Sequence, residues 1–544
     1  MKNQGKRIAF VSLLSVLFLG LTSTAFSQTP VSDEGLKLIE REQPKKGIEA
    51  LRKDPNNYFN LGTGLLITGN TAEALTTFDK GIAADPKNAL NYVGKGRVAL
   101  KQNKLADAEA EFKKATDMTK SKNAEVLAAI GEAWMDKPEL AARAKPILEA
   151  SIGRDKNYKA YMLLGDFYAK QGNGGNAISN YENAAGIAPK DGAPHYKVGL
   201  IYTRSGNIEA AKEAFTKAIT VDPTYTGAYR QLAKEYYNAK DCDNAVKNQQ
   251  KYMELTENPD AGLMAMGFYQ FMCKNYPKAN DLFKQTDTKG LLKATGIRFY
   301  ANSLALSEDF PGAKQMFERF FALDTADDEA ASDWKTYGDV LEKIGEKLSK
   351  PEKRPYDSLA AIAYEKSLSI DPKQTKLQEA LADILLNDLR HTKDAVAAYQ
   401  KLIALRGKAV SGDVFKLGQA FYYDQQFDSA AARFTQLGVM QPTMTVGPLW
   451  SGRSHAQLDP ESTQGLAKPD FEKVIEIGSA DPVKYKADLV QAYSYMGYYY
   501  YLQKDLNESL KNWKKVLELD TNNAQAKTAV KSIEQMKKQQ APKS

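Results

Sequence analysis

Two stretches of this sequence align without a gap: YMLLGDFYAKQGNGGNAISNYENAAGIAPK, residues 161–190, and HYKVGLIYTRSGNIEAAKEAFTKAITVDPT, residues 195–224. The offset from Tyr161 to His195 superposes small, aromatic and proline positions: Gly165 on Gly199, Tyr168 on Tyr202, Ala177 on Ala211, Tyr181 on Phe215, and Pro189 on Pro223. Self-similarity at a fixed period indicates a repeat architecture, in which each unit buries its apolar face against its neighbours.

The same period runs along most of the chain. A glycine or alanine marks each unit, and most steps between these markers are equal: Gly62, Gly96, Gly131, Gly165, Gly199, Ala233, Gly267, Ala301, Gly338, Ala382, Gly418, Gly452 and Gly497. Large side chains recur at helical spacing and are predicted to fill the core between helices: Phe78, Phe112, Phe215, Phe283, Phe317, Phe434 and Trp513. We therefore predict about thirteen units between Pro55 and Asn523.

These features resemble the tetratricopeptide repeat, a helix–turn–helix unit of about 34 residues with the pattern W-x2-L-G-x2-Y…A-x3-F…P. The resemblance implies an all-α fold, in which the units stack into a right-handed superhelical solenoid. It also implies a concave groove that binds protein or peptide partners.

The N-terminus has the three parts of a secretory signal peptide. Basic residues precede an apolar run from Ile8 to Leu21, and the small residues Ala25 and Ser27 follow it. We expect cleavage after Ser27, no transmembrane segment in the mature chain, and export to the periplasm or cell surface of a Gram-negative bacterium. The formal net charge of +7 falls to +4 without the three basic residues of this peptide, so no nucleic-acid partner is expected.

Breaks in the repeat give the predicted boundaries. The largest break adds about ten residues before Ala360, and we interpret it as a polar loop that could act as a hinge. The predicted parts are the signal peptide, 1–27; an N-terminal segment with a cap helix, 28–54; the first part of the array, 55–344; the inserted loop, 345–358; the second part of the array, 359–523; and a C-terminal capping helix with a basic tail, 524–544.

Four consecutive tyrosines, Tyr498 to Tyr501, follow the last marker, Gly497. Tyr500 occupies the position of core aromatic residues in earlier units, and Tyr499 is expected at the junction with the preceding unit. The resemblance places Tyr498 and Tyr501 in the concave groove, whereas the alternative is that all four tyrosines pack in the core.

The groove rule also applies to the other units. It gives these candidates: Tyr196, Arg230, Lys234, Tyr237, Phe268, Arg298, Asn302, Phe415, Gln419, Tyr422, Leu449 and Arg453. Aromatic residues with arginine suit protein or peptide binding. Arg298 and Asn302 also resemble two members of a set that holds a peptide carboxylate, but the next unit offers Ser332 and Thr336 in place of basic residues.

The sequence offers no catalytic, metal-binding or cofactor-binding set. Its three histidines, His195, His391 and His455, lie in different units and lack metal-ligand spacing. We therefore expect a non-enzymatic scaffold or adaptor for protein partners. The alternative is a binding protein for a glycan or cell-wall ligand, with groove tyrosines that stack on sugar rings.

Two cysteines, Cys242 and Cys273, are predicted on the same rim of adjacent units. An oxidising compartment permits a disulfide between them. Stacked helices lie ~10 Å apart, whereas bridged Cα atoms lie within ~7 Å, so the sequence leaves the bridge open.

Overall fold

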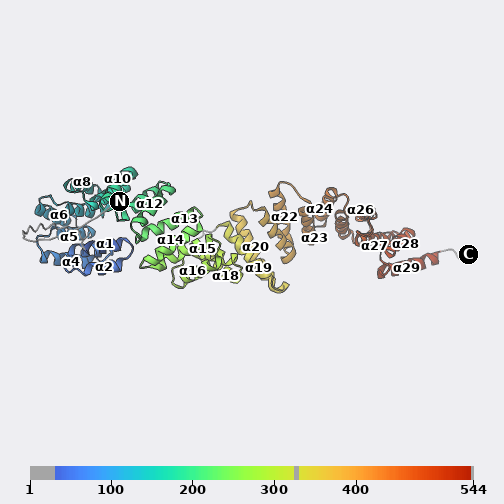
Figure 1. Cartoon of the computed structure of the whole chain (residues 1–544). Coiled ribbons are helices and arrows are strands. Elements are labelled where there is room, and N and C mark those ends of the chain that lie inside the picture. The colour runs from blue at the N-terminus through green and yellow to red at the C-terminus, as the bar shows by residue number, and fades with distance from the viewer. Residues whose placement is uncertain (1–30, 324–329, 541–544) are drawn as a thin grey trace, which may run out of the picture. The chain divides into compact units, whose positions relative to one another are not determined.

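The computed structural model describes residues 31–323 and 330–540, and within these ranges the chain forms helices and no strand (Figure 1). The predicted signal peptide lies outside the described residues. The all-α helical repeat solenoid is confirmed. The chain forms two compact units, which divide between Cys273 and Lys274 and not at the predicted insertion near residue 350.

The first unit consists of short helices that follow one another as antiparallel neighbours. Their bounds are α1 Val31–Glu40, α2 Pro44–Arg52, α3 Tyr58–Ile67, α4 Thr71–Ala84, α5 Ala89–Lys101, α6 Leu105–Thr119, α7 Ala124–Met135, η1 Pro138–Arg143, α8 Ala144–Arg154, α9 Tyr158–Lys170, α10 Gly174–Ile187, α11 Ala193–Arg204, α12 Ile208–Val221, α13 Thr226–Asn238, α14 Cys242–Leu255, η2 Pro259–Gly262 and α15 Leu263–Met272.

The second unit continues the same alternation. Its elements are α16 Tyr276–Thr288, α17 Ala294–Leu306, α18 Phe310–Phe321, α19 Ala331–Gly345, α20 Lys350–Ile370, α21 Thr375–Asp383, η4 Ile384–Leu389, α22 Thr392–Arg406, α23 Ser411–Tyr423, α24 Phe427–Met440, α25 Val446–Leu458, α26 Lys468–Gly478, α27 Lys486–Leu502, α28 Leu506–Leu519 and α29 Ala524–Gln540.

In many of the helix pairs, a marker glycine packs against a large side chain of the second helix. A Cβ atom added at Gly199 would lie 2.4 Å from the ring of Phe215, so glycine allows the two helices to approach. The same contact joins Gly497 to Trp513, where the distance is 2.7 Å. The predicted core residues are buried: Phe78 (0%), Phe112 (4%), Phe215 (0%), Phe283 (0%), Phe317 (0%), Phe434 (0%) and Trp513 (3%).

The predicted loop at 345–358 is wrong for most of its length, because α20 begins at Lys350. The marker Gly338 contacts Tyr364 near the end of this long helix, in the way that Gly199 contacts Phe215. The inserted residues therefore lengthen α20 to 21 residues instead of forming a loop. Pro351 suits the first turn of this helix, since its missing N–H has no partner there in any case.

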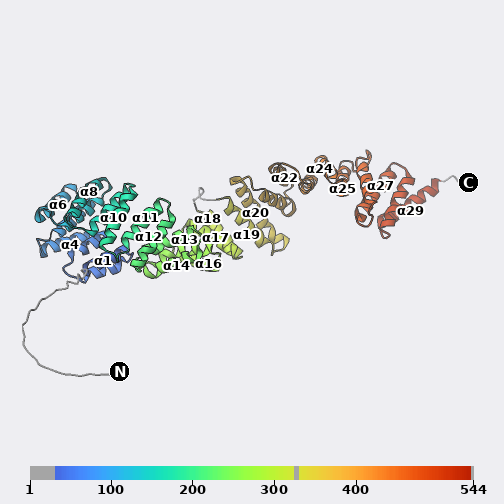
Figure 2. The same ribbon diagram turned by 45° about the horizontal axis from the view of Figure 1, so that its top comes forward.

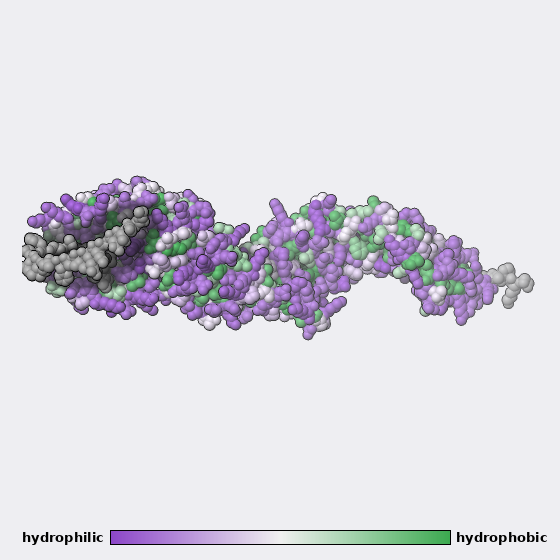
Figure 3. All heavy atoms as spheres, viewed as in Figure 1, coloured by the Kyte–Doolittle hydropathy of each residue, from purple (hydrophilic) through white to green (hydrophobic). Residues whose placement is uncertain are grey.

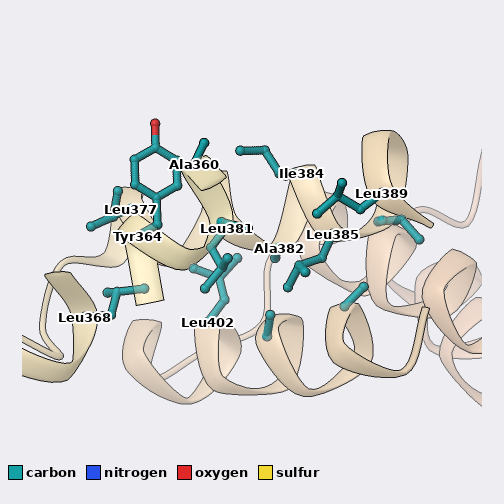
Figure 4. Packing of buried hydrophobic residues seen from close by; sticks show 14 of the residues in the cluster. Ala360, Tyr364, Leu368, Leu377, Leu381, Ala382, Ile384, Leu385, Leu389 and Leu402 are labelled. Atoms are coloured by element: carbon teal, nitrogen blue, oxygen red, sulfur yellow. The ribbon is translucent and has the colours of Figure 1, made fainter. Parts of the chain in front are cut away.

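A π-helical turn, η4, continues α21 and carries a dense apolar face. Its Leu385, Leu386 and Leu389 side chains are buried, and they belong to the largest described core cluster of the second unit. Figure 4 shows Leu385 and Leu389 in this cluster with Leu402 of α22 and Tyr364 of α20. A π turn has i→i+5 hydrogen bonds in place of the i→i+4 bonds of an α-helix. The backbone of η4 therefore departs locally from the regular helix pairs of the repeat.

Both ends of the array differ in detail from the prediction. The N-terminal cap is a hairpin of two helices, α1 and α2, and not a single helix. At the other end, the predicted capping helix is α29, and its Ala526 and Ile533 are buried against Trp513 and Val516. The last four residues of the predicted tail lie outside the described range.

Hydrophilic residues dominate the face of each unit shown in Figure 3, with apolar residues in separate patches. None of the helices in the described ranges combines the length and the apolar character that crossing a membrane requires.

Candidate functional site

An apolar groove lies at the end of the second unit, between α27, α28 and α29. Its volume is about 530 Å³. Its lining residues are Tyr498, Tyr501, Trp513, Ala524, Gln525, Thr528, Ala529, Ser532 and Ile533. The groove thus has aromatic, aliphatic and small neutral walls, and no charged side chain of the described residues lines it.

Two tyrosines supply exposed surface to this groove. Tyr498 is 43% exposed and Tyr501 is 38% exposed, whereas Trp513 and Ile533 beneath them are only 3% and 1% exposed. The groove therefore combines buried apolar side chains with two partly exposed aromatic rings.

The other two tyrosines of the run face a different neighbour. Tyr499 stacks on Tyr495, with ring centroids 6.4 Å apart, and lies against Gly465 of the preceding loop. Tyr500 is half-buried beside an apolar cluster, with the Lys468 ammonium 5.8 Å from its ring. Tyr500 therefore packs against the core, as predicted, but it is only partly buried.

A second aromatic cluster lies on α23 and α25 of the same unit. The Tyr422 and Trp450 rings meet edge to face, 5.4 Å apart, and the Arg453 guanidinium lies 4.7 Å from a Trp450 ring. Arg453 also donates a hydrogen bond of 2.7 Å to the Gln491 side chain. Trp450 was not among the predicted groove residues, whereas the neighbouring Leu449 was, although Leu449 is only 5% exposed. The rarity of tryptophan in this chain was the available signal for Trp450.

Arg298 and Asn302 do not form an open carboxylate site. The Arg298 guanidinium pairs with the buried Asp333 carboxylate at 2.8 Å. The Asn302 side chain donates to the Arg298 backbone carbonyl at 2.9 Å. An incoming carboxylate would have to displace an internal one, so this interpretation has no support.

The groove candidates of the first unit are largely engaged by other residues. Arg230 pairs with Glu42 of the N-terminal hairpin at 2.7 Å, and Tyr196 packs on Phe215 and Tyr225. The remaining candidates vary in exposure: Tyr237, half-buried against Tyr269; Phe268, half-buried; and Lys234, exposed. Two of these candidates, Arg230 and Lys234, also line a small pocket of about 230 Å³ together with Tyr252 and Tyr269.

Cys242 and Cys273 are both free in the structure, so the possible disulfide is not formed there. The two thiols are close enough to interact. Burial raises the pKa of Cys273 to about 12, and a hydrogen bond with the Cys242 thiol acts in the same direction. The bridge in an oxidising compartment stays a prediction.

One of the three histidines makes a structural contact within a helix pair. The His455 Nδ1 atom lies 2.6 Å from the Asp470 carboxylate. In the ranges that the structure covers, no cluster of three or more His, Cys, Asp or Glu side chains could hold a metal ion.

Two family models match the chain, and both are described as tetratricopeptide repeat. One matches residues 158–191 and 194–225, and the other matches 59–124 and 93–142. Together with the helix pairs and their glycine contacts, these matches show that the chain is a tetratricopeptide repeat protein. The matches do not reach the later repeats, so the number of thirteen repeats stays a prediction.

Curated relatives share limited identity with this chain. Hsp70-Hsp90 organizing protein 2 of Arabidopsis thaliana is 27% identical over 141 residues, which cover 26% of this chain and 24% of that protein. DnaJ homolog subfamily C member 3 of Bos taurus is 20% identical over 385 residues, which cover 60% of this chain and 75% of that protein. The chain thus matches about a quarter of the first relative's length.

Among solved structures, the chain is similar to the C-terminal part of a TPR repeat-containing protein from Cytophaga hutchinsonii. The two are 26% identical, the match covers 49% of this chain and 99% of that chain, and the TM-score is 0.35.

Proposed function

We propose that this chain is an exported, non-enzymatic scaffold that binds protein or peptide partners in the cell envelope through its exposed grooves. Tetratricopeptide repeats support a protein-interaction scaffold in general. The observation that carries the finer proposal is the apolar groove beneath Tyr498 and Tyr501, whose rings are exposed above a buried Trp513.

Physical chemistry favours a partner with an apolar side chain at this groove. Burial of apolar surface contributes roughly 25 cal/mol per Å², and rigid aromatic residues around a desolvated centre dominate many interfaces. No charged residue of the described ranges lines the groove, so it offers no counter-ion to a charged ligand. An extended peptide that places an aliphatic or aromatic side chain between the two tyrosines fits these features.

Affinity isolation from cell envelopes tests this proposal. We expect wild-type protein to capture a protein partner, and Tyr498→Ala and Tyr501→Ala each to weaken binding about tenfold, which corresponds to about 1.4 kcal/mol. Leu502→Ala is the matched control, because Leu502 is 36% exposed on the same helix but does not line the groove. Capture of glycans instead of proteins, or equal losses in all three variants, would contradict the proposal.

Export is proposed from the basic start, the apolar run and the small residues before Gln28. Intact-mass measurement on protein from the periplasmic fraction tests it directly. We expect a mature chain that starts at Gln28. A full-length chain confined to the cytoplasmic fraction would contradict export and leave the groove proposal intact.

A further inference from the structure

The N-terminal hairpin, residues 31–52, contacts two parts of the first unit that are far apart in sequence. On one side its Leu51 and Ile48 side chains lie within about 3 Å of a Cβ position at Gly64 of α3, which is apolar packing. On the other side it reaches residues 191–257, at separations of up to 212 residues. In Figures 1 and 2, α1 lies near α12 and α14.

The far contacts are hydrogen bonds and ion pairs. Arg41 donates two hydrogen bonds to the Asp222 carboxylate, at 3.1 and 2.8 Å, and Asp222 is only 6% exposed. The Thr226 hydroxyl donates to the Arg41 carbonyl at 2.5 Å. These bonds attach the turn of the hairpin to the α12–α13 loop.

A second group of contacts involves α13 and α14. Glu42 accepts from the Tyr252 hydroxyl at 2.9 Å and pairs with Arg230 at 2.7 Å. The Gln43 side chain donates to the Leu255 carbonyl at 3.0 Å. The attachment therefore spans the end of α14 as well as the loop before α13.

Glu257 supplies the N-terminal cap of α2 from a distant part of the chain. Gln43, the residue before this helix, makes no side-chain cap. The Glu257 carboxylate instead accepts the backbone N–H groups of Lys45 and Lys46, at 2.9 and 2.8 Å. A carboxylate at a helix N-terminus satisfies unpaired N–H groups and interacts favourably with the helix dipole. The first turn of α2 thus depends on the closed arrangement.

The closed arrangement partly encloses a cavity of about 860 Å³. Leu36, Lys37 and Glu40 of α1 form one wall, and Glu132 of α7 and Asp166 of α9 also line it. In this repeat family, the first helix of each helix–turn–helix unit lines the concave surface. The hairpin therefore covers part of the concave surface of the first unit.

We propose that the hairpin of residues 31–52 is a latch, which closes the first unit into a ring and opens by breaking its polar contacts to α12–α14 while it stays packed on α3. The asymmetry carries this inference: the packing on α3 is apolar, whereas the contacts to α12–α14 are hydrogen bonds and ion pairs. Salt screens the partly exposed Arg230–Glu42 pair more than the buried Arg41–Asp222 pair. The inference that the opened first unit binds a partner rests on the proposed function. The latch itself does not rest on it.

Hydrogen exchange measured by mass spectrometry on the full chain tests the latch. We expect the amides of residues 31–52 to exchange roughly ten- to hundredfold faster in Arg41→Ala, since bonds to charged groups are lost. Glu257→Gln keeps the shape of the side chain but removes the cap charge, and it should increase exchange in the first turn of α2. The wild-type hairpin should also exchange faster at about 1 M salt than at about 0.05 M salt.

Arg52→Ala is the matched control, because Arg52 lies on the same hairpin but pairs with the nearby Glu73, in an exposed bridge of 2.6 Å. This variant should leave exchange in residues 31–52 within about twofold of wild type, as expected for an exposed pair. Unchanged protection in Arg41→Ala and Glu257→Gln would overturn the latch. So would equal acceleration throughout α3–α14, because that result means general unfolding.

Discussion

At the scale of single residues, the marker glycines decide how closely helices pair. Gly199 has no room for a Cβ atom beside Phe215, whereas a Cβ atom at Gly186 would meet no heavy atom within 4 Å. Substitution by alanine should therefore disturb the packing at Gly199 but not at Gly186, although both glycines lie within helices.

Gly199→Ala should lower the free energy of unfolding by about 1–3 kcal/mol, because the new methyl group must displace the Phe215 ring or separate α11 from α12. Gly186→Ala should be neutral or raise it by up to about 1 kcal/mol, because alanine favours the helix. Thermal melts of both variants check this prediction. Equal melting temperatures would contradict the packing role of the marker glycine.

Glu40 gives the hairpin a pH dependence. Burial raises the pKa of Glu40 from 4.5 to about 7, and Asp191 and Asp166 act in the same direction, while Lys197 and Arg41 oppose them. The Glu40 side chain lines the open cavity, where part of its surface still contacts solvent, and this solvent screens part of the shift.

A carboxyl group with a raised pKa stabilises the closed form below pH 4.5, and this contribution disappears as the pH rises towards about 7. The protection of residues 31–52 in hydrogen exchange, corrected for intrinsic rates, should therefore fall between about pH 4.5 and about pH 7.5. Glu40→Gln should remove this part of the pH dependence. Identical pH profiles for the two proteins would count against the assignment.

At the scale of elements, regular repeats were predictable from the sequence and irregular ones were not. The repeat period located the helix pairs, since the repeats place a small residue opposite a large one at similar positions. It could not show that the inserted residues extend α20, because a proline-containing polar stretch is typical of both a loop and a helix start. Nor could the repeat period show the π turn η4, because no particular residue type in the sequence indicates a turn of this kind.

The candidate site was predictable in part for the same reason. Position within a repeat pointed to Tyr498 and Tyr501, and both line the α27–α29 groove, although their role in binding stays a prediction. Position within a repeat could not predict contacts between distant residues, such as the ion pairs of Arg230 with Glu42 and of Arg298 with Asp333. Such partners lie in other helices, far along the chain, and no local pattern specifies them.

The cysteines of α14 and the end of α15 give a prediction at this scale. Because burial and the Cys242 thiol raise the pKa of Cys273 to about 12, its reactive thiolate is scarce at neutral pH. In reduced protein, Cys273 should react with maleimide at least about tenfold more slowly than a free thiol of pKa ~8.5. Cys242→Ser should accelerate this reaction, and an unchanged rate would contradict the coupling.

At the scale of the whole molecule, the local contacts of a repeat array predict graded stability. Stability in such arrays is approximately a sum of repeat terms and nearest-neighbour terms. Helix α29 and the last pair, α27–α28, lie at the end of the array, so they should open at lower free energy than central pairs. Native-state hydrogen exchange checks this expectation, and uniform protection from Tyr58 to Trp513 would contradict it.

Site-specific photo-crosslinking in cells measures whether the α27–α29 groove binds a protein partner. A crosslinking residue at Tyr498 or Tyr501 should capture a protein, whereas the same residue at Val439 should capture none; Val439 is 78% exposed in the same unit but does not line the groove. Addition of Trp513→Ala should abolish capture, because it removes the floor of the groove. Capture from Val439 alone, or no capture from either tyrosine position, would contradict the claim.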